Sequence, residues 1–180
     1  MRLLLLLLAG SLIASEVEAR DARDYKANGE RILKCVEAAE KALLETGVDI
    51  RRQCIGIETQ NCDRTTEDNT YQSNKRMYCA GAEVEVWTAL MEKAYSQLLD
   101  RYATWDQEQS SAQAGQEHKP VVPALKSAHE AWLQGSQDCE FAHIQAGQGT
   151  DRYDAPARCA RDRSAERALL YRKWVRGGTY

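Results

Sequence analysis

Residues 77–105, MYCAGAEVEVWTALMEKAYSQLLDRYATW, decide the fold because they carry the clearest periodic pattern in the sequence. Their apolar side chains recur at intervals of three or four, which places them on one face of a helix of about eight turns. These residues are Met77, Ala80, Val84, Trp87, Met91, Ala94, Leu98, Tyr102 and Trp105. Such a face needs a covering partner, either a second chain in a coiled coil or other helices of the same chain. We expect a bundle within one chain, because the flanking segments carry matching faces.

Outward from this helix, the remaining segments alternate between helical and loop patterns. Residues 25–45 have apolar side chains at helical spacing, and Gly47 can end that helix. Residues 50–62 are a weaker, short helical candidate. Residues 63–74 are rich in side chains that bond their own backbone, so we expect a loop there. Residues 107–120 are polar and predict a flexible connection into which the preceding helix can extend.

The second half of the chain predicts two more helices. Pro123 suits the first turn of one of them. Its apolar positions at intervals of three and four are Leu125, Ala128, Trp132, Gly135, Cys139 and Ala142. Gly147, Gly149 and Pro156 indicate a loop that reverses direction, after which a helical pattern resumes at Cys159. The predicted fold class is all-α, a small antiparallel helical bundle.

The N-terminus predicts export. Arg2 precedes a leucine-rich run, and Val17 and Ala19 suit a signal peptidase, so we expect residues 1–19 to be a signal peptide. The run is too short to span a bilayer, which takes about 20 residues. No cysteine stands at the expected cleavage point, so lipid attachment is not predicted. We expect residues 20–180 to be a single domain without a membrane span, in the periplasm or secreted. An uncleaved apolar anchor is the alternative.

Charge is unevenly distributed along the chain. The net charge of −3 argues against a nucleic-acid partner. Residues 57–140 hold 14 acidic and 7 basic side chains, whereas residues 141–180 hold 4 acidic and 8 basic ones. The acidic part can face a cationic partner, but a solvated surface without a partner explains the same charges.

Six cysteines predict disulfides. An even number in a chain with an export signal is typical of paired cysteines. They are Cys35, Cys54, Cys62, Cys79, Cys139 and Cys159. Zinc binding is the competing interpretation, but there is no CxxC motif and the spacing resembles no zinc site. We therefore expect no metal and no cofactor. Sequence alone allows 15 pairings of six cysteines.

The stretch AHEAWLQGSQDCEF, residues 128–141, raises the question of a catalytic thiol. His129 and His143 lie within helical reach of Cys139, but Cys139 shares the apolar face of Trp132, whereas a reactive thiolate needs an exposed, electropositive site. Cys159 follows after the glycine loop, so we predict a Cys139–Cys159 disulfide that stabilises the fold by about 3 kcal/mol. We find no Ser-His-Asp order and no phosphate-binding loop. We therefore expect a protein that is not an enzyme.

Several motifs together resemble the LprI-like family of lysozyme inhibitors, which are exported bacterial envelope proteins. The motifs are QCIG, RMYCAGAEVEVW, AHEAW, and C-x4-S-x2-R-x2-L ending at Leu170. They cover residues 54–170. The resemblance implies a disulfide-linked helical domain in the cell envelope and lysozyme as a partner. The positions that match structural residues of the family are Trp87, Tyr95, Trp132 and Arg167.

This chain departs from the family pattern at polar positions. The family usually has aspartate and asparagine where this chain has Thr88 and Glu92, and glutamine where it has His129. These differences imply an altered internal hydrogen-bond network. By its position about two turns past Cys159, Arg167 can pair with a carboxylate of the long helix such as Glu92, or remain a solvated arginine.

Cysteines that are neighbours along the sequence are expected to pair, which suggests the remaining two disulfides. Cys62 and Cys79 flank the polar loop, which favours joining them and leaves Cys35 for Cys54.

Two loops carry the candidate partner-binding residues, and each loop lies between the two cysteines of a predicted disulfide. These are Glu67 and Asp68 in the first loop, and Thr150, Asp151 and Tyr153 in residues 145–154. Lysozyme is a basic protein with a carboxylate-lined cleft, so acidic side chains can steer its approach while a side chain on a rigid loop supplies affinity. Alternatively, the loops are plain connectors, and the protein is a periplasmic interaction module for an unknown ligand, without lysozyme inhibition.

Overall fold

The computed structural model describes residues 20–67, 72–112 and 119–177, so the predicted signal peptide lies outside it. The α-helices are α1 (Gly29–Thr46), α2 (Ile57–Thr65), α3 (Gln72–Ala112), α4 (Val121–Gln134), α5 (Gln137–Gln145) and α6 (Ala155–Val175). Three short 3-10 turns and a two-residue parallel strand pair accompany them: η1 (Ala22–Asp24), η2 (Arg51–Cys54), η3 (Thr150–Arg152), β1 (Arg20–Asp21) and β2 (Thr66–Glu67). The all-α prediction is confirmed.

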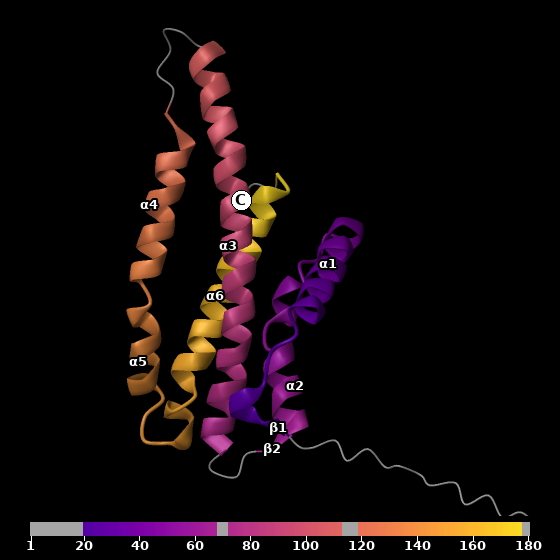
Figure 1. Ribbon diagram of the computed structural model, residues 1–180, viewed down its shortest axis with the longest axis vertical. Coiled ribbons are helices and arrows are strands. Elements are labelled where there is room, and N and C mark those ends of the chain that lie inside the picture. The colour runs from indigo at the N-terminus through magenta and orange to yellow at the C-terminus, as the bar shows by residue number, and fades with distance from the viewer. Residues whose placement is uncertain (1–19, 68–71, 113–118, 178–180) are drawn as a thin grey trace, which may run out of the picture.

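Helix α3 is the axis of the molecule (Figure 1). Helices α4 and α5 run antiparallel to it on one side, α6 returns beside it, and α1 and α2 lie on the other side. The predicted apolar face lines the core at five positions: Ala80, Trp87, Met91, Ala94 and Leu98. The prediction is wrong at Trp105, which is 40 % exposed. The reason is that α3 extends past the end of α6, so fewer helices cover its last turns.

The predicted boundaries need correction in the first half of the chain. Helix α1 begins at Gly29 and ends at Thr46, and Gly47 follows it with φ 73°. The candidate over residues 50–62 is two pieces, η2 and α2, separated by Gly56 at φ 90°. Residues 63–74 are only partly a loop, because α2 continues to Thr65 and α3 already begins at Gln72.

The second half shows a helix break that periodicity did not reveal. We expected one helix over residues 123–142, but α4 and α5 are separated at Gly135 and Ser136. Arg163 of α6 donates hydrogen bonds to the carbonyl oxygens of Trp132 and Gly135. These bonds satisfy carbonyl groups at the end of α4, where the helix itself supplies no donor. Helix α4 packs mainly on α3, whereas α5 packs on α6. Of the predicted apolar positions in this stretch only Leu125 and Cys139 are buried, and Ala128 is exposed.

The three predicted disulfides are confirmed. The pairs are Cys35–Cys54, Cys62–Cys79 and Cys139–Cys159. They join α1 to η2, α2 to α3, and α5 to α6. Each helix on the periphery of α3 is therefore linked covalently to its neighbour, except α4.

A buried carboxylate of α3 holds the start of α2. Glu83 has no exposed surface, and its carboxylate accepts hydrogen bonds from the backbone N–H groups of Gly56 and Thr59, both at 2.7 Å. It also accepts from the Thr59 hydroxyl at 2.7 Å and from Trp87 Nε1 at 2.8 Å. The two backbone groups are the ones that a capping box satisfies within a single helix. Here a different helix supplies the carboxylate.

The same arrangement recurs at two other helix starts. Glu58 of α2, also fully buried, accepts from the backbone N–H of Asn28 at 2.8 Å and from the Tyr25 hydroxyl at 2.6 Å, at the start of α1. Asp106 of α3 accepts from the backbone N–H of Val121 at 2.9 Å, at the start of α4. Carboxylates are favourable at these positions because the N-terminus of a helix carries partial positive charge.

An aromatic cluster between α3, α4 and α6 holds α4 in place. His129 of α4 stacks on Tyr95 of α3 with ring centroids 3.9 Å apart. Its Nδ1 lies 3.0 Å from the hydroxyl oxygen of Tyr171, which is buried on α6. Burial, together with the nearby Arg167 guanidinium, lowers the pKa of His129. The folded protein therefore favours neutral His129.

Arg167 contacts α4 rather than the long helix. Its Nη2 donates to the carbonyl oxygen of Ala128 at 2.9 Å, and its guanidinium lies 5.7 Å from the Trp132 ring centroid and 4.6 Å from that of Tyr171. Among the described residues, these contacts with α4 and with Tyr171 stand in place of the suggested ion pair with Glu92. The aromatic faces attract the guanidinium instead.

Replacing Glu83 with glutamine should weaken the fold. We expect Glu83→Gln to lower the free energy of unfolding by about 3 kcal/mol, because an amide cannot accept at both ends and leaves buried donors unpaired. Urea denaturation at pH 7 measures this change. The control is Glu85→Gln, an exposed position on the same helix, which should shift stability by no more than about 0.5 kcal/mol. Equal effects of the two substitutions would contradict the capping role.

The lowered pKa of His129 makes stability depend on pH. Between the folded-state pKa and the ordinary value of about 6.5, the unfolded chain binds a proton that the folded chain does not. The stability contributed by neutral His129 is thus present above about pH 6.5 and is lost as the pH falls through the lowered pKa. We expect His129→Gln to flatten the decrease in unfolding free energy between pH 7 and pH 5, measured by urea titration. A wild-type slope in His129→Gln would contradict this role of His129.

Candidate functional site

The two predicted loops lie at the same end of the bundle, where α3 begins and α5 turns into α6 (Figure 1). We call this region the loop end; it comprises β2, the first two turns of α3 and residues 145–154. Glu67 is exposed on β2, which pairs with β1. Asp68 lies outside the described residues. Thr150, Asp151 and Tyr153 are all exposed and lie together in and beside η3.

Arg76 in the first turns of α3 connects this helix to the second loop. Its Nη2 donates to Asp151 Oδ1 at 3.0 Å, and its Nε lies 3.4 Å from Asp154 Oδ2. Asp154 is 1 % exposed and also faces Arg158 Nε at 3.1 Å. Burying a carboxylate is costly unless it is paired, and Arg76 and Arg158 supply the pairing here. The start of α3 and the start of α6 are thus joined through Asp154.

Tyr153 is presented to solvent on a well-supported turn. Its side chain is 45 % exposed, and its hydroxyl accepts a 2.6 Å hydrogen bond from Arg152 Nη2. The Arg152 guanidinium also lies 4.7 Å from the tyrosine ring centroid. His143 Nδ1 lies 2.8 Å from the carbonyl oxygen of Arg152, which links η3 to α5. An aromatic ring held in this way loses little freedom when a partner covers it.

The loop end carries mixed charge. Asp151, expected to attract a cationic partner, is already paired with Arg76. Arg152 and Arg158 add further positive charge close by, whereas Glu67 remains an exposed carboxylate. Electrostatic steering by this region is therefore weaker than the acidic side chains alone suggested.

The four residues singled out from the resemblance lie in the bundle and away from the loop end. Trp87 is fully buried and donates to Glu83, while Tyr95, Trp132 and Arg167 belong to the aromatic region around His129. Cys139 is bonded to Cys159, so it has no thiol to act as a nucleophile.

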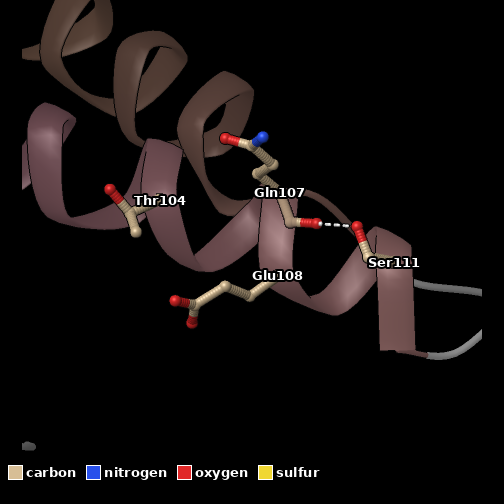
Figure 2. Close-up of a pocket in the computed structure, with 4 residues that line it drawn as sticks. All are labelled: Thr104, Gln107, Glu108 and Ser111. Atoms are coloured by element: carbon tan, nitrogen blue, oxygen red, sulfur yellow. Dashed lines mark hydrogen bonds between the residues drawn. The ribbon is translucent and has the colours of Figure 1, made fainter.

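A surface hollow near the far end of α3 is a poor candidate for a site. Figure 2 shows that its lining side chains, Thr104, Gln107, Glu108 and Ser111, all come from one helix. The Ser111 hydroxyl donates to the Gln107 carbonyl oxygen at 3.0 Å and so is occupied within the helix. A binding site normally has polar groups that converge from several elements. Glu108, by contrast, extends into solvent.

The described residues offer neither a metal-binding cluster nor a membrane-spanning helix. They contain no group of three or more His, Cys, Asp or Glu side chains arranged to hold a metal ion. None of their helices combines the length and apolar character needed to cross a bilayer.

Comparison with protein families gives one match. The model described as "Lysozyme inhibitor LprI" matches residues 62–169, which is more than half of the chain. The chain belongs to the LprI family. The LprI match includes both loops, α3 to α5 and most of α6, with two of the three disulfides. Helix α1 and its Cys35–Cys54 disulfide precede the LprI match.

Comparisons with curated proteins and with solved structures yield no significant match.

Arg76 was not predicted as a site residue, although it lies in the RMYC motif that carries the LprI resemblance. We expect Arg76→Gln to lower the free energy of unfolding by about 2 kcal/mol, because buried Asp154 loses the counter-charge of Arg76. Amide hydrogen exchange at residues 150–154 should also accelerate. The control is Arg52→Gln, since Arg52 and Glu166 form a largely exposed ion pair worth no more than about 0.5 kcal/mol. Unchanged exchange in Arg76→Gln would contradict the connecting role.

Proposed function

We propose that this protein is an exported envelope protein that binds a lysozyme-type peptidoglycan hydrolase and inhibits it. The observation that carries the proposal is the LprI family match, which spans both loops of the loop end. The proposed contact residues are Glu67, Asp68, Thr150, Asp151 and Tyr153.

The rigidity of the loop end supports a role in binding. Residues 145–154 lie between the two cysteines of the Cys139–Cys159 disulfide, and Arg76 fixes Asp151 from a third helix. Such restraint reduces the ordering cost that association otherwise incurs. Tyrosine is enriched among residues that dominate binding energy, so we assign the main contact to Tyr153. Glu67 and Asp68 would then steer the basic hydrolase.

Location outside the cytoplasm supports an encounter with such a hydrolase. Three disulfides are typical of proteins that fold in an oxidising compartment. Together with the signal peptide expected over residues 1–19, they favour the periplasm or the medium. We propose no catalytic role, and the pairing of every cysteine supports that assignment.

A second candidate is an envelope interaction module that binds another ligand without inhibiting lysozyme. The Arg76–Asp151 ion pair favours it, because this pair reduces the negative charge that a basic hydrolase would meet. A panel of purified lysozymes of different types separates the two functions. Inhibition of at least one lysozyme supports the first, and its absence across the panel, with capture of another envelope ligand, supports the second.

Charge reversal tests the steering role of the first loop. We expect Glu67→Lys with Asp68→Lys to weaken inhibition of a sensitive lysozyme by about tenfold, mainly through slower association at low salt. The matched control reverses two exposed carboxylates on other helices, Glu37→Lys with Glu108→Lys, and keeps the same net charge. Equal inhibition constants for the two double variants would show that net charge, and not the loop end, steers the encounter.

A further inference from the structure

Helix α5 exposes two large apolar side chains next to each other. Phe141, the single phenylalanine of the chain, is 59 % exposed, and Ile144 is 70 % exposed. Because they are three residues apart, they are neighbours on the helix surface. Isolated apolar residues are common on protein surfaces, whereas adjacent ones form a patch that can mark an interaction site.

The Cys139–Cys159 disulfide fixes these side chains on the outside. Cys139 is 7 % exposed and faces α6, to which it is bonded. At about 100° per residue, Phe141 points about 200° and Ile144 about 140° away from Cys139 around the helix axis. The covalent bond prevents α5 from rotating to bury them. Their exposure is therefore a fixed property of the fold.

Acidic side chains flank the patch. Asp138 lies one turn before Phe141, and Glu140 lies one turn before Ile144, on opposite sides of the apolar pair. Both carboxylates are exposed, and Gln137–Gln145 contains no lysine or arginine. Asp138 pairs with Arg163 at 3.5 Å, but its side chain is 85 % exposed, so a partner can still reach its carboxylate. An apolar centre with an acidic rim is complementary to a cationic protein surface.

The patch is continuous with the loop end. Helix α5 leads directly into residues 145–154, and the ring centroids of His143 and Tyr153 are 6.3 Å apart. A partner that covers Tyr153 can therefore extend over the outer face of α5. The patch adds the apolar area that the mixed-charge loop end lacks.

We propose that Phe141 and Ile144, rimmed by Asp138 and Glu140, form a docking surface for a cationic protein. This inference rests on the proposed function, because its partner is the basic hydrolase that the loop end contacts. Phe141 and Ile144 supply the apolar contact, and the two carboxylates orient the partner over α5.

The test uses the whole chain and a lysozyme bound by the wild type. We expect Phe141→Ser with Ile144→Ser to raise the Kd at least tenfold, measured by titration calorimetry at pH 7 and physiological salt, while Tm stays within about 2 °C because the side chains are exposed. The matched control is Leu44→Ser with Val48→Ser, an exposed apolar pair at the end of α1 and outside the family match. Its Kd should equal that of the wild type.

A second variant tests the rim without removing apolar surface. Asp138→Asn with Glu140→Gln should reduce the salt dependence of the association rate and raise the Kd about threefold.

If the wild type binds a lysozyme and the Phe141/Ile144 variant binds it equally well, the docking surface is wrong while the proposed function stands. If the wild type binds no lysozyme of the panel, the proposed function fails, and the partner named here fails with it.

Discussion

Every helix ends in backbone groups that find no partner within the helix, and burying them unpaired is costly. In this bundle, charged side chains of neighbouring helices supply the missing partners. Glu83 of α3 serves the start of α2, Asp106 of α3 serves the start of α4, and Arg163 of α6 serves the end of α4. Arg101 of α3 likewise donates to the carbonyl oxygens of Trp174 and Val175 at the end of α6. Helix termination and helix packing thus depend on the same contacts. A nine-residue helix such as α2 is too short to persist alone, so it relies on them.

Much of the fold could be predicted because the signals are local or periodic. The apolar spacing of α3 identified its buried face, and the order of the cysteines identified all three disulfides. Glu83 could not be found in this way, since a glutamate beside an apolar face is typical of an ordinary surface position. Its role exists only once tertiary structure brings Gly56 and Thr59 to α3. The break at Gly135 was hidden for a related reason: helical period continues through it, and the donor that ends α4 comes from Arg163, 28 residues further along.

The candidate site likewise combines residues that the sequence identifies with residues that only the tertiary structure reveals. Thr150, Asp151 and Tyr153 could be selected because glycines and flanking cysteines indicate an anchored loop. Arg76 could not, because its partner Asp151 is 75 residues away and a lysine-arginine pair at a helix start is unremarkable in sequence. The outward face of α5 was missed for a different reason. The predicted apolar positions around Cys139 already exclude Phe141 and Ile144, but only the structure shows that no other element covers them.

The three disulfides join consecutive cysteines, at separations of 19, 17 and 20 residues, and none encloses another. The bonds therefore fall into two sets, two within the segment from α1 to α3 and one between α5 and α6. No disulfide joins α6 to α3, although these two helices share the most extensive contact of the fold. The cohesion of the two halves of the molecule thus depends on noncovalent packing, which a reductant leaves intact.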